Sequence, residues 1–151
     1  MSKHTVTISW QRTTADFDYK TFDRTHTWRF SGGQTVQGSS APAYYGDPAL
    51  ANPEEGLIAA LSSCHMLTFL SIAALKGFIV ESYQDQAEGQ LAKNEQGKTM
   101  VSQITLHPNV VFSGDKIPAP DVFNDMHHKA HQNCFVANSL LTEVVVAPQA
   151  A

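Results

Sequence analysis

The sequence contains only two cysteines, Cys64 and Cys134, in 151 residues. Two cysteines are too few for the disulfide framework that stabilises small secreted domains. In a reducing compartment a structural disulfide is also not expected. Each cysteine is therefore a buried packing residue, a metal ligand or a reactive thiol.

Charged residues are scarce as well, at 16% of the chain with a formal net charge of −4. This balance gives no electrostatic reason to expect nucleic acid or an anionic membrane as a partner. Residues 1–14 alternate apolar and polar side chains and lack the continuous apolar core of a signal peptide. We therefore expect a cytoplasmic protein. We also expect no membrane-spanning helix, because the best apolar run is interrupted by Ser62, Ser63, His65, Thr68 and Ser71.

Hydrophobic periodicity predicts one α+β domain over residues 1–151, in the order β-β-α-β-β-α-β. Residues 4–12 alternate as a strand with one buried face does, and residues 24–30 are expected to pair with it. Residues 31–51 are rich in glycine, serine and proline, and predict a connection too long to be without a function. The remaining strands are expected at residues 78–93, 99–112 and 140–148.

The first helix is expected to begin near Asn52 and has complete end signals. Asn52 is placed to cap the helix, Pro53 suits its first position, and Glu55 stands where a capping box has a carboxylate. Lys76 and Gly77 provide the positive end and the stop. Apolar residues occur on most sides of this helix, which predicts a central position in the fold.

The second helix is expected after Pro120, with Cys134 near its end. Its apolar residues recur at helical spacing, and its histidines His127 and His131 share a face with Cys134. One hypothesis is core packing for the thiol, and a rival is a zinc-like site on that face. The spacing is not a standard structural-zinc pattern, so we expect no metal and treat the histidines as partly exposed residues of the helix face.

Glu54 and Cys64 lie ten residues apart, which is roughly 15 Å along a helix. The two side chains therefore cannot touch within one helix. If both serve one site, a second chain or a basic group must connect them. His65 points about 100° away from Cys64 and is expected to line a pocket at most.

Residues 52–83 and 127–140 together resemble the OsmC/Ohr family, which comprises osmotically inducible and organic hydroperoxide resistance proteins. The resemblance rests on Asn-Pro-Glu-Glu at 52–55, a cysteine ten residues after the first glutamate, and His-x2-Cys before a final strand. It implies an OsmC-like fold, with two long central helices against an antiparallel sheet. It also implies an intertwined homodimer with two sites at the subunit interface.

The resemblance further implies a thiol-dependent peroxidase. Cys64 matches the peroxidatic cysteine, Cys134 the resolving cysteine, and Glu54 the glutamate that positions an arginine beside the thiolate. In the OsmC subgroup that arginine lies about twenty residues before the cysteine, where this sequence has Tyr44 and Tyr45 and no basic residue. Arg24 is the best positional counterpart, with Arg29 in reserve. Without such an arginine the tyrosines would shape the pocket instead.

The expected reaction reduces organic hydroperoxides without a cofactor, in defence against oxidative stress. The family resemblance implies a lipoyl-type dithiol as the reductant. Two alternatives stand beside this hypothesis. One is a non-catalytic scaffold that binds a small apolar ligand at the dimer interface, and the other is the metal site on the face of His127, His131 and Cys134.

Overall fold

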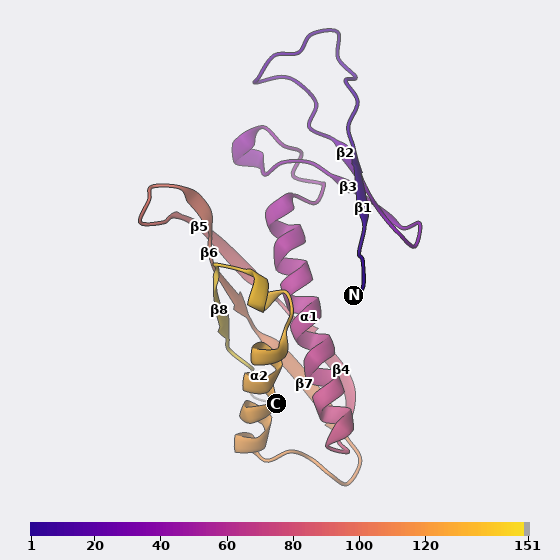
Figure 1. The fold of residues 1–151 in the computed structure, drawn as a ribbon, viewed down its shortest axis with the longest axis vertical. Helices are drawn as coiled ribbons and strands as arrows, with labels where there is room; N and C mark the ends of the chain where they lie inside the picture. The colour runs from indigo at the N-terminus through magenta and orange to yellow at the C-terminus, as the bar shows by residue number, and fades with distance from the viewer. Residues whose placement is uncertain (150–151) are drawn as a thin grey trace. The chain divides into compact units, whose positions relative to one another are not determined.

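The computed structural model describes residues 1–149 and has the expected α+β composition. The chain forms two compact units, one spanning Met1–Gly56 and the other beginning at Leu57. Figure 1 shows the strands and helices of each unit.

The N-terminal unit contains an antiparallel sheet in the order β1-β2-β3, formed by Val6–Ser9, His26–Phe30 and Thr35–Gly38. The predicted pairing of the first two strands is confirmed, with Val6 opposite Phe30. Strand β3 was not predicted, because it lies in a glycine-rich stretch without apolar alternation. It reaches β2 through a tight turn in which Gly33 has φ +91°, a conformation that favours glycine.

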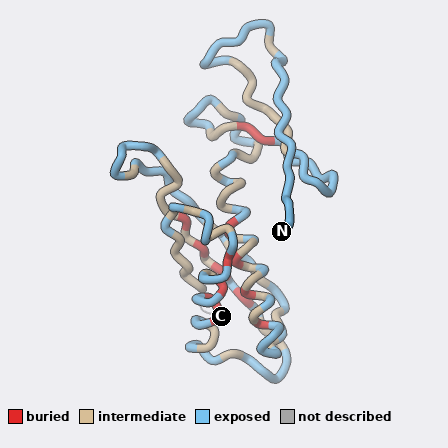
Figure 2. The backbone as a smooth tube through the Cα atoms, in the orientation of Figure 1, coloured by how far each residue is buried: buried red, intermediate tan, exposed pale blue. Residues whose placement is uncertain are grey.

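The prediction that the first strand has one buried face is wrong for the single chain. Val6 and Ile8 are 52% and 57% exposed, and Trp10 beyond the strand is 42% exposed. The physical reason is that the buried core clusters of the described chain consist of residues from Leu57 onward, so no core covers this sheet. Figure 2 shows the same contrast, with nearly the whole of residues 1–37 exposed or half-buried.

Helix α1 (Pro53–Leu75) begins and ends where the sequence predicts. The backbone N–H of Glu55 donates to Asn52 Oδ1 at 2.9 Å, and the backbone N–H of Asn52 donates to the Glu55 carboxylate at 3.1 Å. These two bonds form the reciprocal capping box. At the other end Gly77 adopts φ +78° and donates its backbone N–H to the carbonyl of Ala74.

By length and composition alone, α1 is apolar enough to cross a membrane, so the expectation that no such run exists is wrong. Two of its interrupting hydroxyls bond within the helix, since Thr68 donates to the Cys64 carbonyl and Ser71 to that of Leu67, whereas Ser62 donates to the Asp85 carboxylate. The finding is weak evidence, because the core helix of a water-soluble protein passes the same test. One stripe of α1 is buried at a spacing of four residues, at Leu61, His65, Phe69 and Ala73.

The two long strands expected after α1 are each broken into two. The C-terminal unit contains a sheet of β4 (Ile79–Asp85) with β7 (Pro108–Ser113), and another in the order β5-β6-β8. Asp85 accepts the backbone N–H of His107 at 2.6 Å, so a carboxylate takes the place of a strand partner at the break between β6 and β7. The sheet pairs are antiparallel except β6 with β8, which is parallel. The remaining strands are β5 (Glu88–Lys93), β6 (Thr99–Leu106) and β8 (Glu143–Val146).

Helix α2 (Pro120–Asn133) starts at the predicted proline and ends one residue before Cys134. Phe135 lies beyond the end of α2 and is 83% exposed. Two buried clusters hold the C-terminal unit together. One joins α1 and α2 through Phe69, Ala73, Met126 and Ala130, and the other contains Leu61, Ile104, Leu106 and Cys134.

Candidate redox-active site

Cys64 lies near the middle of α1 and reaches the protein surface. Its side chain is half-buried and lines a pocket of about 600 Å³. The same pocket is lined by Leu67 and Phe135, which are 58% and 83% exposed. Its remaining walls are small or polar and uncharged, from Ala60, Ser63, Thr68, Ser71 and Asn133. A free thiol of the described chain is therefore open to a small apolar molecule.

Cys134 follows the last residue of α2 and is fully buried. Its backbone N–H donates to the His131 carbonyl at 3.3 Å, and its Sγ accepts the backbone N–H of Ala137 at 3.4 Å. Cys64 packs against the buried cluster that contains Cys134. Burial and the neighbouring Cys64 thiol together raise the pKa of Cys134 to about 11.

The two cysteines are therefore free thiols, close to each other and unequal. Cys64 is accessible from a pocket, whereas Cys134 is enclosed and held protonated near neutral pH. The sequence predicted this division between Cys64 and Cys134 only through the family resemblance. An accessible thiol beside a buried one suits a reaction in which the first is oxidised and the second closes a disulfide.

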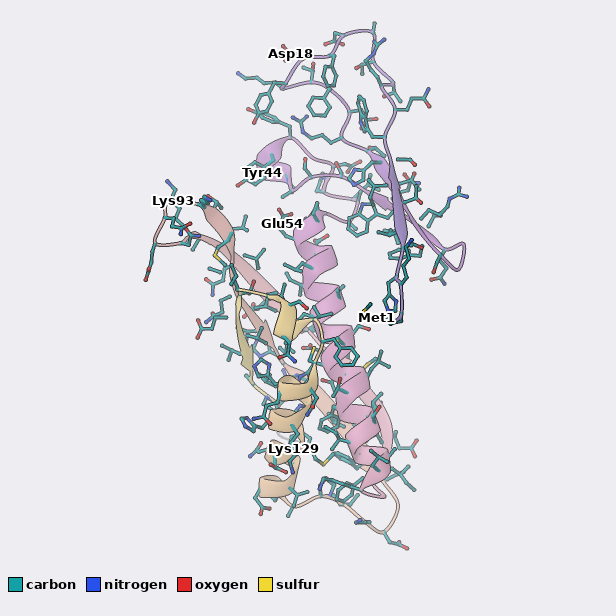
Figure 3. All side chains as sticks on the ribbon, viewed as in Figure 1. Met1, Asp18, Tyr44, Glu54, Lys93 and Lys129 are labelled. Carbon is teal, nitrogen blue, oxygen red and sulfur yellow. The ribbon has the colours of Figure 1, made fainter. Side chains whose placement is uncertain are left out.

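Glu54 lies in the first turn of α1, where Figure 3 labels it. Its neighbour Glu55 makes the capping bond, so Glu54 is free for another role. One carboxylate oxygen of Glu54 is buried and has no hydrogen-bond partner among residues 1–149. A buried carboxylate oxygen without a donor is costly, and a cation is a suitable partner for it. The arginine-positioning role of Glu54 stays a prediction.

Arg24 lies just before β2, in the N-terminal unit. Its guanidinium donates to the carbonyls of Phe22 and Tyr19 at 3.0 and 2.5 Å and stacks 3.9 Å from the Phe22 ring. It has no carboxylate partner within 4.0 Å in the described chain. Arg24 also lines an apolar pocket of about 460 Å³ within this unit, with Ile8, Trp10, Phe17 and Phe22. Arg29 is exposed on β2. An approach of either arginine to Cys64 stays a prediction.

The structure adds a buried histidine pair that sequence reasoning missed. His65 Nε2 and His127 Nδ1 are 3.0 Å apart, and the two residues are 1% and 2% exposed. His127 was expected to be partly exposed, and this expectation is wrong; His65, expected to line a pocket at most, is buried. The available signal was spacing, because His65 lies four residues after Leu61 and four before Phe69 on the buried stripe of α1.

The environment of the pair keeps both imidazoles neutral. Burial lowers the pKa of His65 to about 4, with a further lowering from His131 and an opposing effect of Asp85. Burial and the neighbouring His65 lower the pKa of His127 to about 3. Because the charged form loses hydration in the core, two neutral rings share one hydrogen bond near pH 7.

The metal hypothesis gains no support from the geometry. Within residues 1–149, no group of three or more histidine, cysteine, aspartate or glutamate side chains is arranged to hold a metal ion. Cys134 packs in the apolar cluster, and His127 Nδ1 is engaged with His65.

The C-terminal unit of this α+β fold thus contains two free thiols that form a candidate thiol-reactive site. The family described as OsmC-like protein matches residues 46–148, and the chain belongs to this family. This confirms both the family resemblance and the OsmC-like fold. No curated protein matches the chain.

Solved structures extend the match over the whole chain. An OsmC-like protein of unknown function from Vibrio cholerae is 46% identical, with a TM-score of 0.94 and coverage of 99% of this chain and 100% of that one. An organic hydroperoxide resistance protein from Elizabethkingia anophelis is 17% identical, with a TM-score of 0.75 and coverage of 100% and 98%. The organic hydroperoxide resistance protein OhrB of Bacillus subtilis is 15% identical, with a TM-score of 0.69 and coverage of 98% of each chain. The latter two show the fold alone.

Proposed function

We propose that the protein is a thiol-dependent peroxidase that reduces organic hydroperoxides in defence against oxidative stress in the cytoplasm. The observation that carries this proposal is the placement of an accessible Cys64 next to a buried Cys134 whose pKa is raised to about 11. Membership of the OsmC family supports the same chemistry, because organic hydroperoxide resistance proteins share this fold.

The reaction proceeds in three balanced steps. The Cys64 thiolate attacks the peroxide and breaks its O–O bond, which leaves a sulfenic acid on Cys64, and the departing alkoxide takes a proton from water and leaves as the alcohol. The Cys134 sulfur then displaces the sulfenic oxygen, so that a Cys64–Cys134 disulfide forms and one water leaves. An external dithiol, lipoyl-type by family resemblance, reduces the disulfide to two thiols and becomes a cyclic disulfide itself.

The pocket beside Cys64 supports an organic substrate rather than hydrogen peroxide. Its lining includes Ala60, Leu67 and Phe135 and contains no charged side chain. An apolar group of the substrate gains free energy by leaving water for these walls, at about 25 cal/mol per Å². Hydrogen peroxide has no such group.

A homodimer is part of the proposal. Helix α1 is apolar on most sides, yet its buried residues form one stripe, and Leu67 and Leu75 are 58% and 89% exposed. Exposed apolar surface on this scale indicates an interaction partner, and a second copy is the occupant that the family resemblance implies. A second copy also offers a donor for the unpartnered oxygen of Glu54.

Purified protein tests the proposal with cumene hydroperoxide and a dithiol. Wild type is expected to consume both and to show a Cys64–Cys134 disulfide by mass spectrometry after one equivalent of peroxide. Cys64→Ser is expected to abolish consumption. Cys134→Ser is expected to trap one sulfenic acid per chain without an intramolecular disulfide. A Cys64→Ser variant with the wild-type rate would end the proposal.

A second candidate function is a non-catalytic scaffold that binds a small apolar ligand. The observation in its favour is that the pocket of Cys64 has no basic lining residue. All three arginines of the sequence, Arg12, Arg24 and Arg29, lie in the N-terminal unit. Thiols that resist organic hydroperoxide, together with saturable binding of an apolar dye displaced by long-chain alcohols, would favour the scaffold.

A further inference from the structure

The two elements that present the cysteines are joined by one buried polar contact. His65 follows Cys64 on α1, and His127 lies on α2, seven residues before Cys134. Their ring nitrogens are 3.0 Å apart and their ring planes are within 2° of parallel. Among residues 1–149, this is the one hydrogen bond that joins a side chain of α1 to a side chain of α2.

The His127 ring is held in place by aromatic neighbours, and His65 packs against His127. Phe69 of α1 stacks on His127 with a centroid distance of 4.2 Å, and Phe123 of α2 meets the same ring edge-on at 4.7 Å. Both histidines are almost fully enclosed. An imidazole confined in this way has no alternative rotamer at low cost. Its hydrogen bond therefore fixes the position of one helix relative to the other, because the side chain cannot move to follow a displaced partner.

Stability alone does not explain the pair. His65 Nδ1 and His127 Nε2 are buried without a partner among residues 1–149. In a neutral pair one of these atoms bears a proton and the other a lone pair, whichever tautomer is present. Replacing both members of such a pair with apolar groups of similar shape is often neutral or stabilising. An apolar pair would lack the directional hydrogen bond, which holds the two side chains in one relative position.

We propose that the His65–His127 pair is a positioning device that sets the register of α1 against α2, so that Cys64 and Cys134 meet at disulfide-forming distance. A helix rises about 1.5 Å per residue, and a slip of that size breaks a 3.0 Å hydrogen bond. A disulfide has a comparably narrow tolerance, with Cβ atoms about 3.5–4.5 Å apart. This inference rests on the proposed function only through the Cys64–Cys134 disulfide.

The redox potential of the cysteine pair is the decisive measurement. The protein is equilibrated with glutathione buffers, in which two glutathione thiols become one glutathione disulfide as the protein disulfide becomes two thiols. In His65→Leu/His127→Leu we expect the equilibrium constant for disulfide formation to fall at least about tenfold, which raises the potential by about 30 mV. A merely structural substitution destabilises both redox states equally and leaves this potential unchanged.

Two polar variants separate geometry from polarity. His65→Gln/His127→Asn places amide atoms where Nε2 of His65 and Nδ1 of His127 lie, so it is expected to restore the potential to within about twofold in equilibrium constant. The swapped variant, His65→Asn/His127→Gln, carries the same groups at the wrong lengths and is expected to behave as the leucine pair does. His128→Leu, at an exposed position of α2, is the control and is expected to match wild type.

Three outcomes would overturn the inference. They are a wild-type potential in the leucine pair, equal potentials in the matched and swapped amide variants, and a wild-type chain that forms no Cys64–Cys134 disulfide with the thiol oxidant diamide. A wild-type chain that forms this disulfide with diamide but not with cumene hydroperoxide removes the peroxidase proposal. The shifted potential of the leucine pair then still supports the positioning role.

Discussion

Cys134 is fully buried beside Cys64, which is half-buried and opens onto a pocket. The two thiols differ in solvent accessibility because of where they lie, one in the middle of α1 and the other directly after α2. Reaction with an external molecule should therefore begin at Cys64.

Alkylation tests this inequality directly. With iodoacetamide at pH 8, we expect Cys64 to be modified at least about tenfold faster than Cys134. Cys134 is 0% exposed, and its pKa of about 11 leaves only about one thiolate per thousand at that pH. Peptide mass spectrometry over time measures both rates. In urea the two rates should converge, whereas equal rates in the folded protein would contradict the assignment.

Substitution of Arg24 tests the predicted source of thiolate activation. An adjacent guanidinium favours the thiolate over the thiol, so Arg24→Ala should reduce peroxide consumption at pH 7 by about tenfold or more. Arg29→Ala is the matched control at an exposed position of the same unit. If Arg29→Ala shows the loss and Arg24→Ala does not, the roles of the two arginines are reversed.

The parts of the fold that were predicted correctly are those set by interactions between residues close together in the sequence. Asn52, Glu55 and Gly77 mark the ends of α1 because capping depends on neighbours three or four positions away. The breaks between the strands at Asp85 and His107 were missed because a carboxylate 22 residues away receives the His107 backbone N–H. Strand β3 was missed because its pairing with β2 does not depend on apolar alternation.

Prediction of the site was limited in the same way, because contacts between residues far apart in the sequence were missed. Both cysteines were singled out by their rarity and the family motif, and they lie close to each other in the fold, while their catalytic roles stay predictions. The partnership of His65 and His127 links residues 62 positions apart and leaves no local pattern beyond the four-residue spacing on α1. His127 was predicted to be partly exposed because sequence spacing alone did not show which face of α2 meets the core, whereas His128 is exposed and His131 half-buried, as predicted.

The helix cap should contribute measurably to stability. Asn52→Ala removes the side-chain oxygen that accepts the Glu55 N–H at 2.9 Å, and should lower the free energy of unfolding by about 1 kcal/mol. Asn52→Asp retains an acceptor and should stay within about 0.5 kcal/mol of wild type. Urea unfolding followed by circular dichroism measures both. Equal stabilities for the alanine and aspartate variants would exclude the capping role.

Mild acid should destabilise the protein through the buried histidines. In the unfolded chain both residues titrate near pH 6.5, but the folded-state pKa values are about 4 for His65 and about 3 for His127. Between pH 6.5 and 4 the unfolded state therefore binds more protons, so the free energy of unfolding falls as pH falls, by up to about 2.7 kcal/mol per pH unit for two groups. Asp85 on β4 opposes this effect at His65, and His131 on α2 adds to it.

Urea titrations at pH 7, 6 and 5 measure how the free energy of unfolding depends on pH, and His65→Leu/His127→Leu should flatten this slope relative to wild type. His128→Leu, at an exposed position on the same helix, should leave the slope unchanged. Parallel pH profiles for wild type and the leucine pair would show that the pair is not the origin of the acid sensitivity.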